Sequence, residues 1–368
     1  MPARPPPSTL AVPPRGAPVP LVRDAYGFLT LPGTFSAPAD LPHRVEAPSF
    51  DVWPTSAEVV ERTLLGDVEL SAEDARAHPG IAPLARAALD AWAGTPEPAG
   101  VHRIAPGVRV VPVRTPTLPP ATQTNTWVLG EHELSIVDPA SPWPDEQARL
   151  LAALRALARA GRPVVRILLT HHHLDHVSGA EVLASALGVP VLAHPETRAR
   201  VAVRVDEELA PDAVVGQGID ALRCVLTPGH APGHLCFARE NGVLAAGDMV
   251  AGVGTILVDP DEGDMLEYLA SLERLRALAP ALLLPAHGPP ILRAEAKLAE
   301  YRAHRLMREA RVVTALAQAR TLDALVPLAY ADTPAAVWPL AARSLRAHLD
   351  KLVKDGRVRR VGDEWTLV

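Results

Sequence analysis

The sequence predicts an α/β protein of sheets with helices packed outside them, followed by a small domain of three helices and a β-hairpin. Between residues 101 and 300, short apolar runs bounded by turn residues alternate with helical stretches, a pattern typical of helices on sheets. Residues 301–368 hold 12 Lys and Arg against 7 Asp and Glu, although the whole chain has a net charge of −6. These changes divide the chain into residues 1–100, 101–295 and 296–368.

The composition is that of a globular protein. The chain has 368 residues, of which 48% are hydrophobic and 21% charged, which excludes a wholly disordered protein. No stretch reaches the roughly 20 uninterrupted apolar residues of a membrane helix, and the first residues lack the apolar core of a signal peptide. Cys224 and Cys236 are too few for a disulfide framework. We therefore expect a cytoplasmic protein that is not attached to a membrane.

The first hundred residues are rich in proline and carry no recognisable chemistry. The 39 prolines of the chain crowd its first 120 residues. We expect an extended arm at the start and two amphipathic helices, over residues 56–65 and 81–94.

The middle part alternates between strand and helix signals, and the order of its elements is as follows. Strands are predicted at 108–113, 126–130, 134–139, 164–170, 189–195, 222–228, 234–240 and 242–248, with one more in the apolar run LLLP before His287. Helices are predicted at 146–161, 180–188 and 264–279. Asp264 is the expected N-cap of the last of these helices.

The last part predicts three helices and a hairpin. A long helix covers residues 296–319, a short one follows Thr321, and a third begins near Thr333-Pro334 and ends at Gly356. Residues 357–368 read as a β-hairpin. This order of elements is typical of a winged-helix domain.

A cluster of histidines and aspartates carries the predicted chemistry. His171, His173, Asp175 and His176 follow a buried strand directly. Neutral imidazoles combined with a carboxylate suit Zn²⁺ or a similar divalent ion, whereas a solvated polar loop is the alternative without function. His230, Asp248 and His287 each follow another apolar run, so we expect all seven side chains to converge at one edge of the sheets.

This combination resembles the metallo-β-lactamase superfamily. The motifs HxHxDH, PGH, GD and HG occur in that family's order over about residues 105–295. The resemblance implies a four-layer αβ/βα sandwich with two metal ions, which we expect to be zinc. It assigns His171, His173 and His230 to the first ion, Asp175, His176 and His287 to the second, and Asp248 to both.

Further stretches are similar to the β-lactamase-like protein 2 family, in which a winged helix follows the metal domain. They are PGHAPGHLCF, the stretch GDMVAGVGTILVDPDEGDMLEYLASLERL (residues 247–275), and EYRAHRLMRE. One member type of that family is a metal-dependent endoribonuclease that acts on single-stranded RNA.

The resemblance implies a dinuclear metal-dependent hydrolase that attacks its substrate with a metal-bound hydroxide. Asp175 and Asp248 are the expected catalytic carboxylates, since the resemblance places both beside that water. A phosphodiester in single-stranded RNA is the first substrate hypothesis. A thioester, lactone or other acyl ester, as in glyoxalase II-like relatives, is the second, and a non-catalytic nucleic-acid-binding protein is the third.

Two questions stay open at the level of sequence. The basic residues of the tail could contact phosphates, or they could be a solvated face of a domain that covers the cleft or forms a homodimer contact. They are Arg343, Arg346, Lys351, Lys354, Arg357, Arg359 and Arg360. Among the other histidines, we expect His172 to face away from the ligands and His234 to lie behind them.

Overall fold

The structure is a computed structural model that describes residues 97–368 and five short strands before them. These strands are β1 (Thr9–Ala11), β2 (Val19–Arg23), β3 (Leu29–Thr30), β4 (Arg44–Glu46) and β5 (Val68–Leu70). β1 pairs with β4, and β2 lies between β3 and β5. The helices predicted at 56–65 and 81–94 lie outside the described residues.

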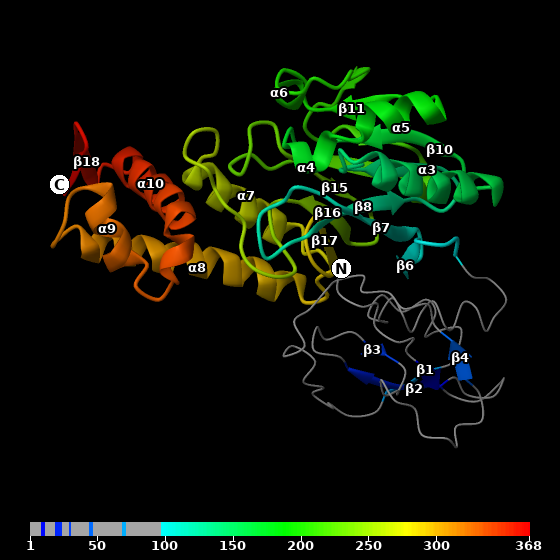
Figure 1. Ribbon diagram of the computed structural model, residues 1–368, viewed down its shortest axis with the longest axis horizontal. Coiled ribbons are helices and arrows are strands. Elements are labelled where there is room, and N and C mark those ends of the chain that lie inside the picture. The colour runs from blue at the N-terminus through cyan, green and yellow to red at the C-terminus, as the bar shows by residue number, and fades with distance from the viewer. Residues whose placement is uncertain (1–8, 12–18, 24–28, 31–43, 47–67, 71–96) are drawn as a thin grey trace. The chain divides into compact units, whose positions relative to one another are not determined.

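One compact unit contains five neighbouring strands in the order β10-β9-β8-β7-β6 (Figure 1). They are β6 (His102–Ala105), β7 (Val108–Arg114), β8 (Gln123–Leu129), β9 (Leu134–Val137) and β10 (Val164–Leu168). β10 runs parallel to β9 because α3 (Pro144–Arg159) provides the crossover between them. α5 (Ala180–Leu187) packs on β10 and α3.

The second unit contains a five-stranded sheet in chain order, from β13 to β17. Its strands are β13 (Val214–Val215), β14 (Leu222–Leu226), β15 (Leu235–Ala238), β16 (Val243–Gly247) and β17 (Leu282–Pro285). The first four strands pair antiparallel, and α7 (Met265–Ala277) leads from β16 to its parallel neighbour β17. The unit also holds the parallel pair β11 (Val191–Ala193) and β12 (Glu207–Glu208) and the short helices α4 (Leu174–Val177) and α6 (Pro195–Arg198).

The same unit ends in three helices and a hairpin, as predicted. These are α8 (Ala294–Ala315), α9 (Leu322–Ala329), α10 (Trp338–Lys354), β18 (Val358–Val361) and β19 (Glu364–Leu367). The predicted stripe of Leu345, Leu349 and Leu352 is buried, and it packs with residues of α9 and the hairpin in one apolar cluster.

The start of α10 corrects the sequence analysis. Thr333-Pro334 precedes only a short 3₁₀ turn, Ala335–Val337, and the α-helix begins at Trp338. Pro339 explains the shift, because proline lacks an N–H and its ring clashes with the preceding helical turn. It therefore fits the first turn of a helix but not its interior.

Most predicted strands and helices of residues 97–368 are present with boundaries shifted by a few residues. β6, β12 and β13 were not predicted; the last two have only two residues each. No helix in the described part of the chain is long and apolar enough to cross a membrane.

Candidate metal centre

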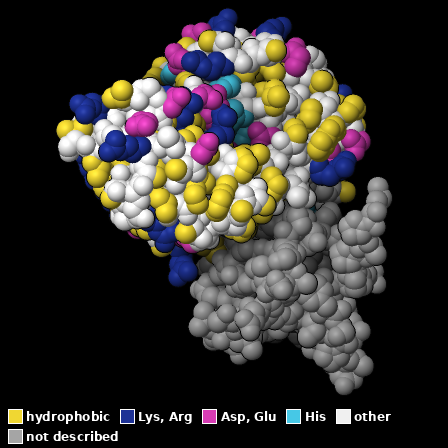
Figure 2. Space-filling model, turned by 60° about the vertical axis from the view of Figure 1, so that its left-hand side comes forward, with side chains coloured by type: hydrophobic (Ala, Val, Ile, Leu, Met, Phe, Trp, Pro, Cys, Tyr) yellow, Lys and Arg dark blue, Asp and Glu magenta, His cyan; other side chains and the backbone are white. Residues whose placement is uncertain are grey.

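Loops that follow strands and the short helix α4 position all seven predicted side chains, which lie within the second unit. His171 and His173 lie between β10 and α4 in the chain, and α4 carries Asp175 and His176. His230 lies in the turn from β14 to β15, Asp248 directly follows β16, and His287 follows β17. His173 and Asp175 are partly exposed, and the other five side chains are buried. Figure 2 shows histidine side chains reaching the surface beside acidic and basic ones.

Three histidines form the first group. His171 Nε2 lies 2.9 Å from His173 Nδ1, and His230 Nε2 lies 3.3 Å from the former and 3.1 Å from the latter. The other nitrogen of His230, Nδ1, lies 2.9 Å from the carbonyl oxygen of Leu257. Because a carbonyl only accepts, this nitrogen carries the proton and Nε2 presents its lone pair to the group.

Asp175, His176 and His287 form the second group. His287 Nε2 lies 3.5 Å from Asp175 Oδ2, and His176 Nε2 lies 3.9 Å from Asp175 Oδ1. These atoms are close enough to face one small cation but too far apart for good hydrogen bonds between them.

Asp248 lies between the two groups. Its Oδ1 is 3.4 Å from His287 Nε2 and 3.6 Å from His176 Nε2, while its Oδ2 is 3.6 Å from His230 Nε2. Among the described residues, the buried Oδ1 accepts no hydrogen bond. A buried carboxylate oxygen without such a partner is costly unless a cation neutralises it.

The protonation states also suit metal binding. Burial lowers the pKa of His171 well below its ordinary value, and the neighbouring His176 lowers it further. Burial also lowers the pKa of His230 to about 4. Burial would raise the pKa of Asp248, but His287 and His176 lower it well below its usual range. At neutral pH His171 and His230 are therefore neutral and Asp248 is charged, and both kinds of donor suit Zn²⁺ and similar ions.

Two further histidines, His172 and His234, lie next to the two groups of candidate ligands. His234 lies behind Asp248, as predicted: its Nε2 accepts a hydrogen bond from the Asp248 amide, and its Nδ1 lies 2.9 Å from Thr227 Oγ1. His172 does not face away, because its Nε2 lies 2.8 Å from Glu262 Oε2. The other oxygen of Glu262 lies 2.6 Å from His173 Nε2. Glu262 was not predicted from the sequence, in which its only signal is the acidic stretch Asp259–Gly263.

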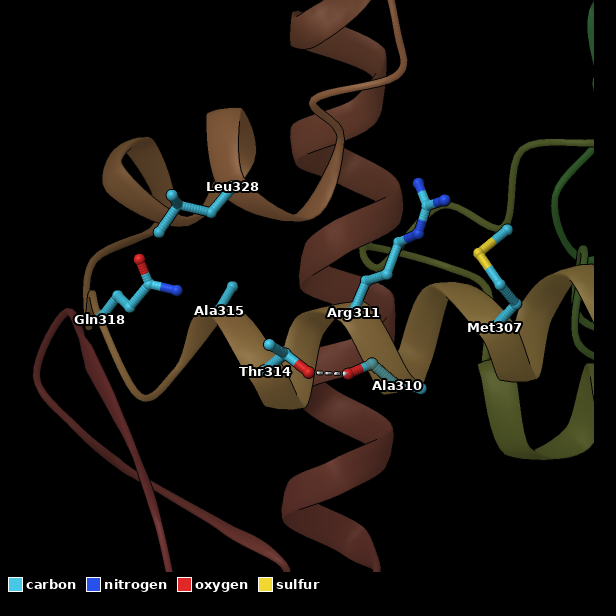
Figure 3. A pocket seen from close by; sticks show the side chains of 7 residues that line it. All are labelled: Met307, Ala310, Arg311, Thr314, Ala315, Gln318 and Leu328. Atoms are coloured by element: carbon cyan, nitrogen blue, oxygen red, sulfur yellow. Dashed lines mark hydrogen bonds between the residues drawn. The ribbon is translucent and has the colours of Figure 1, made fainter.

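A hollow elsewhere in the molecule lacks this chemistry. A cavity of about 330 Å³ lies between α8 and α9 (Figure 3). Its cationic residue, Arg311, pairs with Asp332 at 2.6 Å, and its Thr314 hydroxyl donates to the Ala310 carbonyl. The remaining lining residues are Met307, Ala315, Gln318 and Leu328. None of these is a typical metal ligand, so the candidate centre remains the histidine cluster.

The basic residues of the tail are largely paired with acidic ones. Arg343 contacts Asp259 and Asp261, and Arg346 also contacts Asp261. Four more pairs follow the same pattern: Lys351 with Glu309, Lys354 with Asp264, Arg357 with Glu309, and Arg360 with Asp363. Six of the seven residues that were candidates for phosphate contact thus already have an acidic neighbour.

Two family models match this chain. The family model for the metallo-beta-lactamase superfamily matches residues 119–287, and the model for the beta-lactamase associated winged helix domain matches residues 321–365. The beta-lactamase-like protein 2 homolog of Drosophila melanogaster is 31% identical over 255 residues, which cover 64% of this chain and 84% of that protein.

The chain is also similar to named enzymes and to a protein of known structure. The hydroxyacylglutathione hydrolase of Acidiphilium cryptum is 33% identical over 168 residues, or 45% of this chain and 65% of that protein. Further relatives are named thioesterases. The crystal structure of a β-lactamase domain protein from Burkholderia ambifaria has a TM-score of 0.64 at 25% identity, and the match covers 75% of this chain and 96% of that one. The predicted fold class is confirmed.

Proposed function

Because the chain belongs to the metallo-β-lactamase superfamily, and matched relatives are named as a hydrolase and a thioesterase, we propose that it hydrolyses thioesters or related acyl esters with two zinc ions. The observation that carries the proposal is the position of Asp248. One of its oxygens faces His176 and His287, and the other faces His230. A single carboxylate is thereby available to two ions at once.

The ligand roles follow from the two groups. His171, His173 and His230 would hold one ion, and Asp175, His176 and His287 the other, with Asp248 shared between them. Bound divalent ions would supply Lewis acidity and lower the pKa of a water molecule to about 7.

The protein's own residues would orient this chemistry. Asp175 is only partly buried, so its carboxylate can reach a substrate and accept a proton from the attacking water. Buried Asp248 would stay ionised because His287 and His176 hold its pKa low. His234 would fix the Asp248 backbone through the amide hydrogen bond.

The charge distribution favours an acyl ester over RNA. An RNA-binding surface needs arginines and lysines free to replace the counterions of phosphates. In the winged helix, six of the seven candidates contact acidic side chains instead. The names of relatives as hydroxyacylglutathione hydrolase and thioesterases support the same substrate class.

The test is a substrate panel with metal-replete protein and an Asp248→Ala variant as the blank. We expect hydrolysis of an S-acyl thioester or a lactone that changes little between 50 and 200 mM salt, values at which binding to nucleic acid falls steeply. Asp248→Ala should lose both activity and bound zinc. Cleavage of RNA without hydrolysis of any acyl ester would contradict the proposed substrate class. A wild-type protein that binds no metal would contradict the whole proposal.

A further inference from the structure

We propose that Glu262 is a positioning residue for the metal ligand His173, and that α10 of the winged helix holds the loop that carries Glu262. We call residues Asp259–Gly263 the acidic loop. The inference rests on the proposed function only in taking His173 to be a metal ligand.

The two nitrogens of His173 face different partners. Nδ1 lies 2.9 Å from His171 Nε2 and 3.1 Å from His230 Nε2, so it points into the first group. Nε2 lies 2.6 Å from Glu262 Oε1. A carboxylate only accepts, so Nε2 carries the proton and Nδ1 is left with the lone pair that a metal needs. Glu262 therefore selects both the tautomer and the orientation of the ring.

In each of the three histidines of the first group, one ring nitrogen points away from the group and contacts another residue. Only in His173 is that residue charged, because it is Glu262. Nδ1 of His171 contacts the Thr170 hydroxyl, and Nδ1 of His230 contacts the Leu257 carbonyl. A carboxylate partner makes an imidazole more basic and a better ligand than a neutral partner does. His173 is also the most exposed of the three, so it has the least packing to fix its ring. Glu262 thus contacts the histidine whose ring orientation is least fixed by packing.

Glu262 itself is held from two sides. Its second oxygen lies 2.8 Å from His172 Nε2, which fixes the plane of the carboxylate. Within the acidic loop, the Gly263 amide donates to the Asp259 carbonyl at 2.6 Å, and the Asp261 amide donates to the Asp259 side chain. The loop is thereby closed into a compact turn.

Two arginines of helix α10 donate hydrogen bonds to this turn. Arg343 donates from Nε and Nη2 to the two carboxylate oxygens of Asp259, at 2.5 and 2.6 Å. Arg346 donates to Asp261 at 3.0 Å. A two-point arginine–carboxylate pair fixes direction as well as distance. A continuous set of contacts thus leads from the winged helix through the acidic loop to a metal ligand.

The experiment measures metal binding rather than turnover. Zinc affinity is determined by competition with a chromophoric chelator, and the Co²⁺-substituted protein is examined by visible absorption. Wild type should bind two ions. Glu262→Gln keeps one hydrogen-bond acceptor but no charge, so we expect affinity at one ion to fall about 10-fold, and Glu262→Ala to lower it up to about 100-fold. Both should alter the Co²⁺ spectrum while two ions remain bound at saturation.

A second pair of variants tests the role of α10. Arg343→Met should weaken zinc binding less than Glu262→Ala, and the double variant should be no weaker than Glu262→Ala alone, because both changes act through one contact chain. Arg359→Met, an exposed arginine on β18, is the matched control and should leave affinity unchanged. Additive losses, or an Arg343→Met protein identical to the control, would overturn the part played by α10.

The remaining outcomes separate this inference from the proposed function. If wild type binds two ions and Glu262→Ala binds them with the same affinity and spectrum, the positioning role is wrong and the proposed function stands. If wild type binds a third ion that Glu262→Gln loses, Glu262 is a ligand together with His172 and His173, and the positioning role is again wrong. A wild-type protein without metal would refute both.

Discussion

At the scale of single residues, the candidate centre depends on backbone shapes as much as on imidazoles. Gly229, next to His230, has φ of +122°. A Cβ there would lie 2.2 Å from the Tyr268 amide nitrogen and 2.4 Å from its Cα, both backbone atoms of α7. The Gly229 carbonyl also accepts a hydrogen bond from the Asp264 amide. The His230 turn therefore packs directly against the start of α7, with no room for a side chain.

We predict that Gly229→Ala displaces His230 and weakens metal binding. Backbone strain and overpacking together should cost about 2–3 kcal/mol of unfolding free energy, and zinc content should fall. Gly188→Ala is the matched control, because Gly188 also has a positive φ, +70°, but nothing lies within 4 Å of its Cβ position. It should keep full zinc content, measured by elemental analysis of purified protein. Equal zinc loss in both variants would contradict the steric argument.

At the scale of elements, the ends of strands could be predicted from sequence because apolar runs and turn residues mark them locally. The same signals located His230, Asp248 and His287. Glu262 escaped because it lies 89 positions from His173 along the chain, and no local pattern couples the two. The start of α10 was misplaced because Thr333-Pro334 carries the same start signal as a true cap, while the competing requirement of Pro339 lies five residues later.

The N-cap of α7 was predicted and gives a prediction at this scale. Asp264 Oδ1 accepts hydrogen bonds from the Leu266 and Glu267 amides, at 2.8 and 3.2 Å, while Lys354 contacts its other oxygen. Asp264→Ala should lower the free energy of unfolding by about 1 kcal/mol. Asp264→Asn should cost much less, because asparagine also caps and an exposed ion pair contributes little. Urea unfolding of the three proteins measures both effects. An asparagine variant as unstable as the alanine one would mean that the Lys354 pair dominates.

At the scale of the whole molecule, α10 joins two apolar cores of the second unit. Ala347 belongs to the core around α7 and β16, whereas Leu345 and Leu349 belong to the winged-helix core. His348 lies between them, fully buried, and neither ring nitrogen has a hydrogen-bond partner among the described residues. The boundary between the two cores therefore contains a buried titratable side chain, His348, without a hydrogen-bond partner among the described residues.

This buried histidine predicts how stability depends on pH. Burial, reinforced by Arg305, lowers the pKa of His348 from 6.5 to about 3. The unfolded chain therefore takes up a proton first as the pH falls, so stability is complete above about pH 6.5 and is lost progressively toward pH 3. By pH 5 the loss due to this one residue is about 2 kcal/mol. His348→Met, which keeps the volume and removes the titration, should lose about 2 kcal/mol less than wild type between pH 7.5 and pH 5. Urea unfolding of both proteins at the two pH values measures this difference. The contributions of the metal-site histidines to the pH dependence are the same in both proteins and cancel in the comparison. An equal loss in the two proteins would mean that His348 is neutral in the unfolded chain as well, or charged within the fold.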